Sequence, residues 1–169
     1  SSAISHKTEA GGVRLHLSSA ADVERAAHAL AASAAKAAPG AAIDGYLVQE
    51  MVDGVEMIVG ARTDPLYGPM LVVGAGGILV ELVEDAAMLL LPTSAEEVEA
   101  AIRRLKIAKL LAGYRGKPAA DMAVLVKSIM AIAAFAEAHR DALLELDVNP
   151  LMVRADGAVA VDALVVLGQ

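Results

Sequence analysis

The chain has 169 residues and carries 14 Lys and Arg against 21 Asp and Glu, a net charge of −7. Because the two signs are mixed along the chain, this composition gives no basic footprint for nucleic acid. The absence of cysteine excludes disulfides and thiolate chemistry, and no apolar run is long enough to cross a membrane. No signal peptide is visible, so we expect a cytoplasmic protein of one domain, or of two small lobes sharing a core.

The N-terminal segment combines a glycine pair with a short alternating pattern. Residues 13–17 alternate apolar with basic side chains, which predicts a half-buried strand. The preceding residues 4–13 read Ile-Ser-His-Lys-Thr-Glu-Ala-Gly-Gly-Val, and the glycines suit a tight turn or a close backbone approach. A lone histidine near a terminus is usually a solvated surface residue, so His6 taken by itself indicates no function.

One helix and two β-rich runs follow. Residues 19–38 predict a helix that covers a sheet, because Ser19 with an aspartate three residues on gives a capping-box-like start. Residues 43–52 and 55–60 are β-rich, and Asp53-Gly54 between them predicts a hairpin.

Residues 64–91 hold a turn cluster and a glycine-rich loop between β-rich stretches. Asp64-Pro65-Leu66-Tyr67-Gly68-Pro69 predicts a turn. The later Gly74-Ala75-Gly76-Gly77 follows a strand and could suggest a dinucleotide-binding loop. That interpretation is weak, because the pattern lacks its third glycine and a β-rich stretch follows where a helix should begin.

Two further helices are predicted in the second half. Ser94, with Glu97 three residues on, predicts a helix whose buried face comprises Val98, Ile102 and Leu105. A second amphipathic helix runs to about His139, and its apolar face comprises Leu125, Ile129, Ile132 and Ala133. Between them lies a loop containing Arg115, for which an anion or interface contact and a merely solvated side chain are equally plausible.

The chain ends in two β-rich segments, 144–151 and 158–163. Acidic and amide side chains alternate with Leu and Val in the first segment, so one strand face carries Glu145, Asp147 and Asn149. If Asp156-Gly157 forms the hairpin loop, Ala155 faces Ala158 and Leu151 faces Asp162. Asn149 is then diagonal to Asp162, within reach of one ion. By composition alone, however, this polar face could simply meet water.

Four motifs in order resemble the ATP-grasp domain of the NDP-forming acyl-CoA synthetases, relatives of the succinyl-CoA synthetase beta chain. They are the segment 4–13, Gly-Gly-Ile-x-Val-Glu from Gly76, Leu-x-Gly-x-Arg-Gly from Leu111, and Leu-Asp-Val-Asn-Pro-Leu from Leu146 with its later Asp. The resemblance implies an α/β (α+β) fold of two lobes, each a sheet with helices. It assigns residues 1–52 to the remainder of a truncated N-terminal lobe with its hinge, and 53–169 to the C-terminal lobe.

The resemblance also implies roles for individual residues. Asn149 and Asp162 would hold the Mg²⁺ of ATP or ADP, and His6 would accept a phosphoryl group, with the motif's acid Asp147 as a second catalytic residue. Glu56 would contact the ribose, although Glu50 is an alternative for that role. The hinge would comprise Gln49, Glu50, Met51 and Val52, and the phosphoryl-transfer end would include Gly76, Gly77 and Glu81.

The implied reaction interconverts an acyl-CoA, NDP and phosphate with a free acid, CoA and NTP, through acyl phosphate and phosphohistidine. CoA binding and the main phosphohistidine would belong to partner domains of an oligomeric enzyme. One departure stands out, because the family has an Arg in the strand before Pro92 where this chain has Met88-Leu89-Leu90-Leu91. The departure favours a rival interpretation, a regulatory synthetase-like domain of a protein lysine acetyltransferase. A purely structural α/β module is a third alternative.

Overall fold

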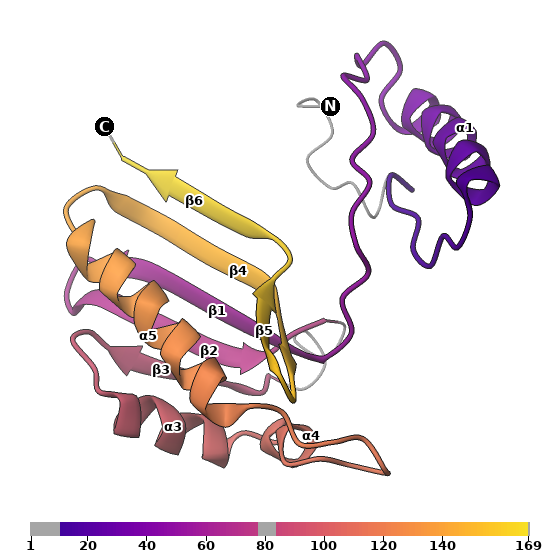
Figure 1. Cartoon of the computed structure of the whole chain (residues 1–169). Helices are drawn as coiled ribbons and strands as arrows, with labels where there is room; N and C mark the ends of the chain where they lie inside the picture. Colours follow the sequence, from indigo (N-terminus) through magenta and orange to yellow (C-terminus); the bar gives the residue numbers. More distant parts are fainter. Residues whose placement is uncertain (1–10, 78–83, 169) are drawn as a thin grey trace. The chain divides into compact units, whose positions relative to one another are not determined.

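The chain forms two compact units, Ser1–Met51 and Val52–Gln169, in the computed structural model (Figure 1). The structure describes residues 11–77 and 84–168. The assignment of the two units to the lobes 1–52 and 53–169 stays a prediction. Within the described residues, every helix is too short or too polar to span a bilayer.

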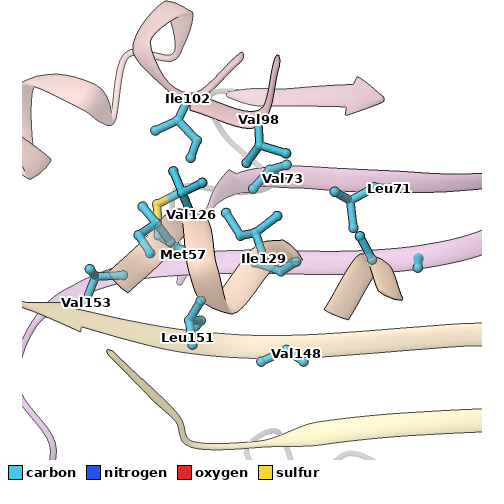
Figure 2. Packing of buried hydrophobic residues seen from close by; sticks show 14 of the residues in the cluster. Met57, Leu71, Val73, Val98, Ile102, Val126, Ile129, Val148, Leu151 and Val153 are labelled. Carbon is cyan, nitrogen blue, oxygen red and sulfur yellow. The ribbon is translucent and has the colours of Figure 1, made fainter. Parts of the chain in front are cut away.

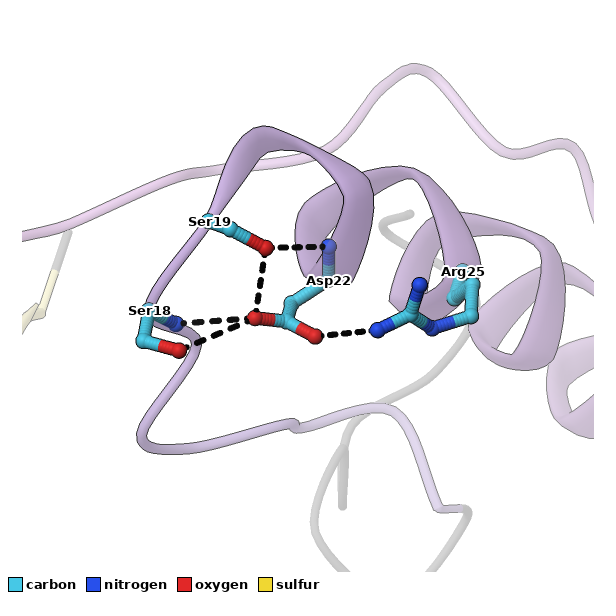
Figure 3. A network of polar contacts seen from close by, with 4 residues as sticks. All are labelled: Ser18, Ser19, Asp22 and Arg25. Atoms are coloured by element: carbon cyan, nitrogen blue, oxygen red, sulfur yellow. Dashed lines mark hydrogen bonds and ion pairs between the residues drawn. The ribbon is translucent and has the colours of Figure 1, made fainter.

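The first unit contains the predicted helix, α1 (Ala20–Ala37). The Ser19 hydroxyl accepts a hydrogen bond from the Asp22 amide at 3.2 Å and donates to the Asp22 carboxylate at 2.7 Å. Ser18 donates to the same carboxylate, which also pairs with Arg25 (Figure 3). The hydrogen bonds from Ser19 and then Ser18 lower the pKa of Asp22. The helix start is therefore capped as its sequence predicts.

The two strands predicted in this unit are wrong. Residues 12–17 and 41–53 carry no strand, and the hairpin predicted at Asp53-Gly54 does not form. Leu47 is 83% exposed. A strand needs a neighbouring backbone to complete its ladder, and no described segment of this unit supplies one. Local β propensity was therefore not sufficient to form a sheet here.

The second unit is built on a six-stranded antiparallel sheet in the order β3-β2-β1-β4-β5, with β6 also paired to β4. The strands are β1 (Val55–Asp64), β2 (Gly68–Ala75), β3 (Ala86–Leu90), β4 (Leu143–Arg154), β5 (Gly157–Ala160) and β6 (Ala163–Leu167). Long β4 lies beside β1 on one side, and beside β5 and β6 in succession on the other (Figure 1). The mixed α/β architecture confirms the predicted fold class.

The predicted turn between β1 and β2 is confirmed. One oxygen of the Asp64 carboxylate accepts hydrogen bonds from the amides of Leu66 at 2.8 Å and Tyr67 at 3.0 Å. These bonds lower the pKa of Asp64. Gly68 closes the turn at φ +79°, a left-handed conformation that glycine adopts without steric cost.

The described residues of this unit also form three helices, α3 (Ala95–Arg104), α4 (Ala108–Leu111) and α5 (Met122–Ala138). The Ser94 hydroxyl accepts from the Glu97 amide, and the Glu97 carboxylate accepts from the Ser94 amide, so the predicted capping box is confirmed. The predicted buried faces of α3 and α5 are confirmed as well, since Val98, Ile102, Leu125 and Ile129 are fully buried.

The core lies between one face of the sheet and the helices α3 and α5. Alternate residues of β1, β2 and β4 pack against apolar side chains of these helices (Figure 2). The labelled core residues in that figure include Met57, Val73, Ile102, Ile129 and Val148. The other face of the sheet is left uncovered by the described elements of this unit. We call it the open face.

Asp85 is a buried polar residue that the sequence did not single out. Its side chain is 8% exposed. Its two carboxylate oxygens accept hydrogen bonds from the amides of Lys106 and Ile107, each at 2.8 Å. Because these amides belong to the connection between α3 and α4, Asp85 ties that connection to the start of β3.

Candidate functional site

The candidate site lies on the open face, where β4 presents its polar residues. Leu146 and Val148 are buried in the core, whereas Glu145, Asp147 and Asn149 alternate with them and point to the other side. This division confirms the predicted alternation. The polar residues are therefore held at fixed spacing by a strand whose opposite face is anchored in the core.

The hairpin turn lies one residue earlier in the chain than predicted. Arg154 pairs with Gly157 and Leu151 with Ala160, so the loop residues are Ala155 and Asp156. The predicted pairing of Leu151 with Asp162 is wrong. An Asp-Gly signal locates a turn without fixing its central residues, whereas the register is decided by which side chains the whole ladder turns toward the core.

The corrected register brings the two predicted metal ligands directly opposite each other. The Asn149 amide donates to the Asp162 carbonyl at 3.2 Å, and the Val161 amide donates to the Pro150 carbonyl at 3.0 Å. Directly opposed residues have Cβ atoms about 4.5–5.5 Å apart, closer than the predicted diagonal. Both side chains are exposed on the open face, so their oxygens can reach a common ion.

The side-chain oxygens of this pair are largely uncommitted. One Asp162 oxygen accepts from the Ala163 amide at 2.9 Å. Within the described residues, neither the second Asp162 oxygen nor the Asn149 side chain makes a hydrogen bond. In that part of the chain, no group of three or more His, Cys, Asp or Glu side chains could hold a metal by itself. The pair therefore fits an ion that takes its remaining ligands from elsewhere.

Asp147 lies one alternate position before Asn149, in a cluster of negative charge. Its partial burial, the charge of Glu145 and the charge of Asp162 together raise the pKa of Asp147. Its partner across the ladder is Gly60, which has no side chain to cover the carboxylate from directly opposite. The carboxylates of this cluster repel one another, and a bound cation would relieve that repulsion.

A second part of the site joins Glu56 to the glycine loop after β2. The Gly76 amide donates to the Glu56 carbonyl at 2.8 Å. Gly77 has φ +68°, and a Cβ atom at that position would overlap the Glu56 carboxylate. Only glycine therefore leaves Glu56 room to lie over the loop. This contact brings together a residue predicted to bind ribose and a loop predicted to lie at the phosphoryl end.

The two parts lie along the same stretch of β1. A register shift between Met57 and Val59 places Ile58 opposite Asn149 and Pro150. Glu56 follows two residues further along, a displacement of roughly 7 Å at the usual rise of a strand. Asn149, Asp162, Glu56 and the glycine loop therefore share one region of the open face.

Four of the remaining predicted residues lie in the segment that precedes β1. Gln49, Glu50 and Met51 belong to the first unit and Val52 begins the second. All four lie in a segment without helix or strand. His6 and Glu81 lie outside the described residues. Their predicted roles stay predictions.

The open face also carries residues that the sequence analysis missed or found unusual. Arg62 of β1 pairs with Glu145 of β4, a cross-strand pair of opposite charge. Alternation from Glu56 could have placed Arg62 on this face. In β3, where the resemblance predicts an Arg, Met88 and Leu90 are exposed at 67% and 54%. That strand therefore carries exposed apolar side chains in place of the predicted positive charge.

The second unit is a mixed α/β domain whose antiparallel sheet has helices on one face and a carboxylate–amide pair beside a glycine loop on the other. Comparison with known proteins assigns the family. Residues 1–167 match the ATP-grasp domain family, and the chain belongs to that family. This match confirms the ATP-grasp domain that the sequence motifs predicted.

Two of the relatives are named ADP-forming acetate–CoA ligases. The chain is 35% identical to acetate–CoA ligase (ADP-forming) I of Archaeoglobus fulgidus over 165 residues, covering 97% of this chain and 24% of that protein. It is 32% identical to the acetate–CoA ligase (ADP-forming) II subunit beta of Pyrococcus furiosus, covering 97% of this chain and 71% of that subunit. The chain thus spans about a quarter of the single-chain ligase.

Solved structures of a related synthetase share the fold. The dinucleotide-forming acetyl-coenzyme A synthetase 1 of Ca. Korarchaeum cryptofilum, in complex with coenzyme A, Ca-AMPCP and HgCl+, matches with a TM-score of 0.88 at 33% identity, covering 97% of this chain and 72% of that chain. A second structure of that protein, in complex with coenzyme A and Mg-AMPPCP, matches with a TM-score of 0.78 at 31% identity, covering 96% and 70%.

Proposed function

We propose that this chain is the nucleotide-binding part of an NDP-forming acyl-CoA synthetase and that it binds Mg²⁺–ATP and Mg²⁺–ADP on its open face. The observation that carries the proposal is the Asn149–Asp162 pair, directly opposed across the hairpin beside Asp147. The relatives named as ADP-forming ligases support the substrate class. We propose the cytoplasm as its compartment, because CoA and nucleotide are both available there.

The donor set of the open face suits Mg²⁺. This ion is usually bound through one or two carboxylates together with phosphate oxygens and waters. Asp162 supplies one carboxylate and Asn149 a neutral carbonyl oxygen, which limits the repulsion of the nucleotide's own charge. When bound, the ion would neutralise charge on the phosphates during phosphoryl transfer.

The reaction proposed for this part is exchange of the terminal phosphoryl group with a histidine. In the direction of NTP synthesis, a terminal oxygen of NDP attacks the phosphorus of phosphohistidine and the P–N bond breaks. The departing ring nitrogen takes a proton from a carboxylic acid or water, which gives neutral imidazole. His6 is the proposed relay histidine in this chain. Asp147 is proposed as an acid of the phosphoryl-transfer step, since its raised pKa favours the protonated carboxyl group.

The complete ligase reaction needs further parts. The Pyrococcus furiosus relative is named as a subunit, and the Archaeoglobus fulgidus relative is about four times as long as the matched region. We therefore propose that CoA-binding and phosphohistidine domains act with this chain in one oligomeric enzyme.

Met88 and Leu90 support a second candidate, a regulatory synthetase-like domain. Both are exposed apolar side chains in the strand where the resemblance predicts an Arg. A full-length protein that binds Mg²⁺–nucleotide yet forms no acyl-CoA from any short-chain acid would establish this second candidate over the ligase.

The metal role is tested by changing Asp162→Asn in the full-length protein. We expect affinity for ADP in the presence of Mg²⁺, measured by calorimetry, to fall about tenfold, equivalent to ~1.4 kcal/mol. Affinity measured in EDTA should change little, because without the ion the side chain has no partner on the nucleotide. The matched control is Asp141→Asn, an equal charge change at an exposed position before β4.

Two results would contradict the proposal. Equal ADP affinity for wild type and Asp162→Asn in Mg²⁺ would remove the metal role. A loss of the same size in Asp141→Asn would show that net charge, and not the Asn149–Asp162 pair, sets the affinity.

A further inference from the structure

The basic residues of this acidic chain are concentrated in one segment. Residues 103–117 carry six Lys and Arg and no Asp or Glu, whereas the rest of the chain carries eight Lys and Arg against all 21 Asp and Glu. The segment comprises the end of α3, the short α4 and the following loop. Positive and negative residues are therefore not evenly mixed along the chain, contrary to what we expected from the overall composition.

Four of these cations are exposed and unpaired. Arg103 is paired with Glu99. Within the part of the chain that the structure describes, Arg104, Lys109, Arg115 and Lys117 make no ion pair. All four are exposed. We call these four residues the basic surface. All four belong to this one segment and their charges are unneutralised within the described residues, so an anionic partner that binds the segment would neutralise them.

The loop that carries Arg115 is held in a fixed shape. The Ala120 amide donates to the Leu111 carbonyl at 2.8 Å, and the Lys117 amide to the Tyr114 carbonyl at 3.1 Å. Arg115 has φ +50°, a left-handed conformation that costs a non-glycine residue free energy. The structure therefore holds Arg115 in a strained position at the tip of a closed loop. Because the loop is already ordered, it loses less conformational entropy when a partner binds.

Apolar side chains lie among the cations. Leu110 is 37% exposed and Tyr114 is 49% exposed. The Arg115 guanidinium carbon lies 5.3 Å from the centroid of the Tyr114 ring. Tyrosine and arginine are enriched in protein interfaces, and an apolar centre with a charged rim is typical of them. A single small anion would use a few cations and leave Leu110 and Tyr114 exposed.

We propose that the basic surface docks an acidic protein surface on the remaining domains of the ligase. The identity of the partner rests on the proposed function, whereas the charge and apolar content of the surface do not. A protein surface is favoured over nucleic acid because Tyr114 is the only aromatic residue in the segment, too few to stack successive bases. The contact would be steered by charge and would weaken as salt is raised.

The test is zero-length carbodiimide cross-linking of the full-length protein, followed by mass spectrometry of peptides containing Lys117. We expect links from Lys117 to Asp or Glu outside this chain, with the yield falling at least fivefold in 1 M NaCl. Changing Lys109→Glu and Arg115→Glu together should lower the yield at least fivefold in low salt. The matched control, Lys127→Glu with Arg140→Glu, alters net charge equally and should leave the yield unchanged.

Three results would overturn the proposal. The first is that Lys117 cross-links only to residues of this chain or of a second copy. The second is that the cross-linking yield falls equally in the two double variants. The third is that a 20-nucleotide RNA binds at 150 mM salt and that Lys109→Glu with Arg115→Glu abolishes this binding. Mg²⁺–ADP affinity of both double variants should equal that of wild type. Absence of nucleotide binding in wild type would count against the proposed function while leaving the cross-linking result to decide the docking surface.

Discussion

Asp85 gives the sharpest test of how the second unit is held together. Its carboxylate is buried and accepts two backbone hydrogen bonds of 2.8 Å, from Lys106 and Ile107. Hydrogen bonds to a charged group contribute about 1.5–3 kcal/mol each, and a buried amide left without an acceptor costs about 1–3 kcal/mol. Removing both acceptors with Asp85→Ala should therefore lower the free energy of unfolding by roughly 3–5 kcal/mol.

A conservative substitution of Asp85 should lose only part of this stability. Asp85→Asn keeps one carbonyl acceptor but turns an NH₂ group toward the second amide, so we expect a loss of about 2–3 kcal/mol. Urea denaturation measures both losses. Hydrogen exchange locates them, because the amides of Lys106 and Ile107 should lose protection more than the amides of β1.

Glu84→Gln is the matched control, since Glu84 is the exposed neighbour of Asp85. It should change the free energy of unfolding by less than about 0.5 kcal/mol. If Asp85→Ala proved as mild as Glu84→Gln, or if protection at Lys106 and Ile107 were unaltered, the tie between β3 and the α3–α4 connection would not be stabilising.

Two further changes test the open face. Because the pKa of Asp147 is raised in the folded protein, that carboxylate disfavours folding as pH rises. Asp147→Asn should raise the melting temperature near pH 7 without metal, with the gain vanishing below about pH 4; an equal gain at all pH values would refute this. Gly77→Ala and Gly116→Ala both place alanine at positive φ and should each lose roughly 1 kcal/mol of stability. Only Gly77→Ala displaces Glu56, so only it should weaken ADP binding by calorimetry, and equal affinities would remove Glu56 from the site.

Local signals determined the helices and the acidic strand. Ser19 and Ser94 begin their helices as their side chains predict, because a cap is formed by residues three apart in sequence. The alternation around Asp147 also gave the correct division between core and open face. Such features depend on a period of two or of 3.6 residues, which a sequence displays directly.

Tertiary structure decided the features that depend on a partner distant in the chain. The β-rich runs of the first unit carry no strand, because propensity cannot provide a neighbouring backbone. The register that opposes Asn149 to Asp162 was set by the whole ladder of β4 and not by the Asp-Gly turn. Asp85 went unnoticed because burial is a property of three-dimensional neighbours, and only the structure shows that four cations of the basic surface make no ion pair within the described residues. The sequence therefore supplied the chemical groups of the site, and the sheet decided which of them meet.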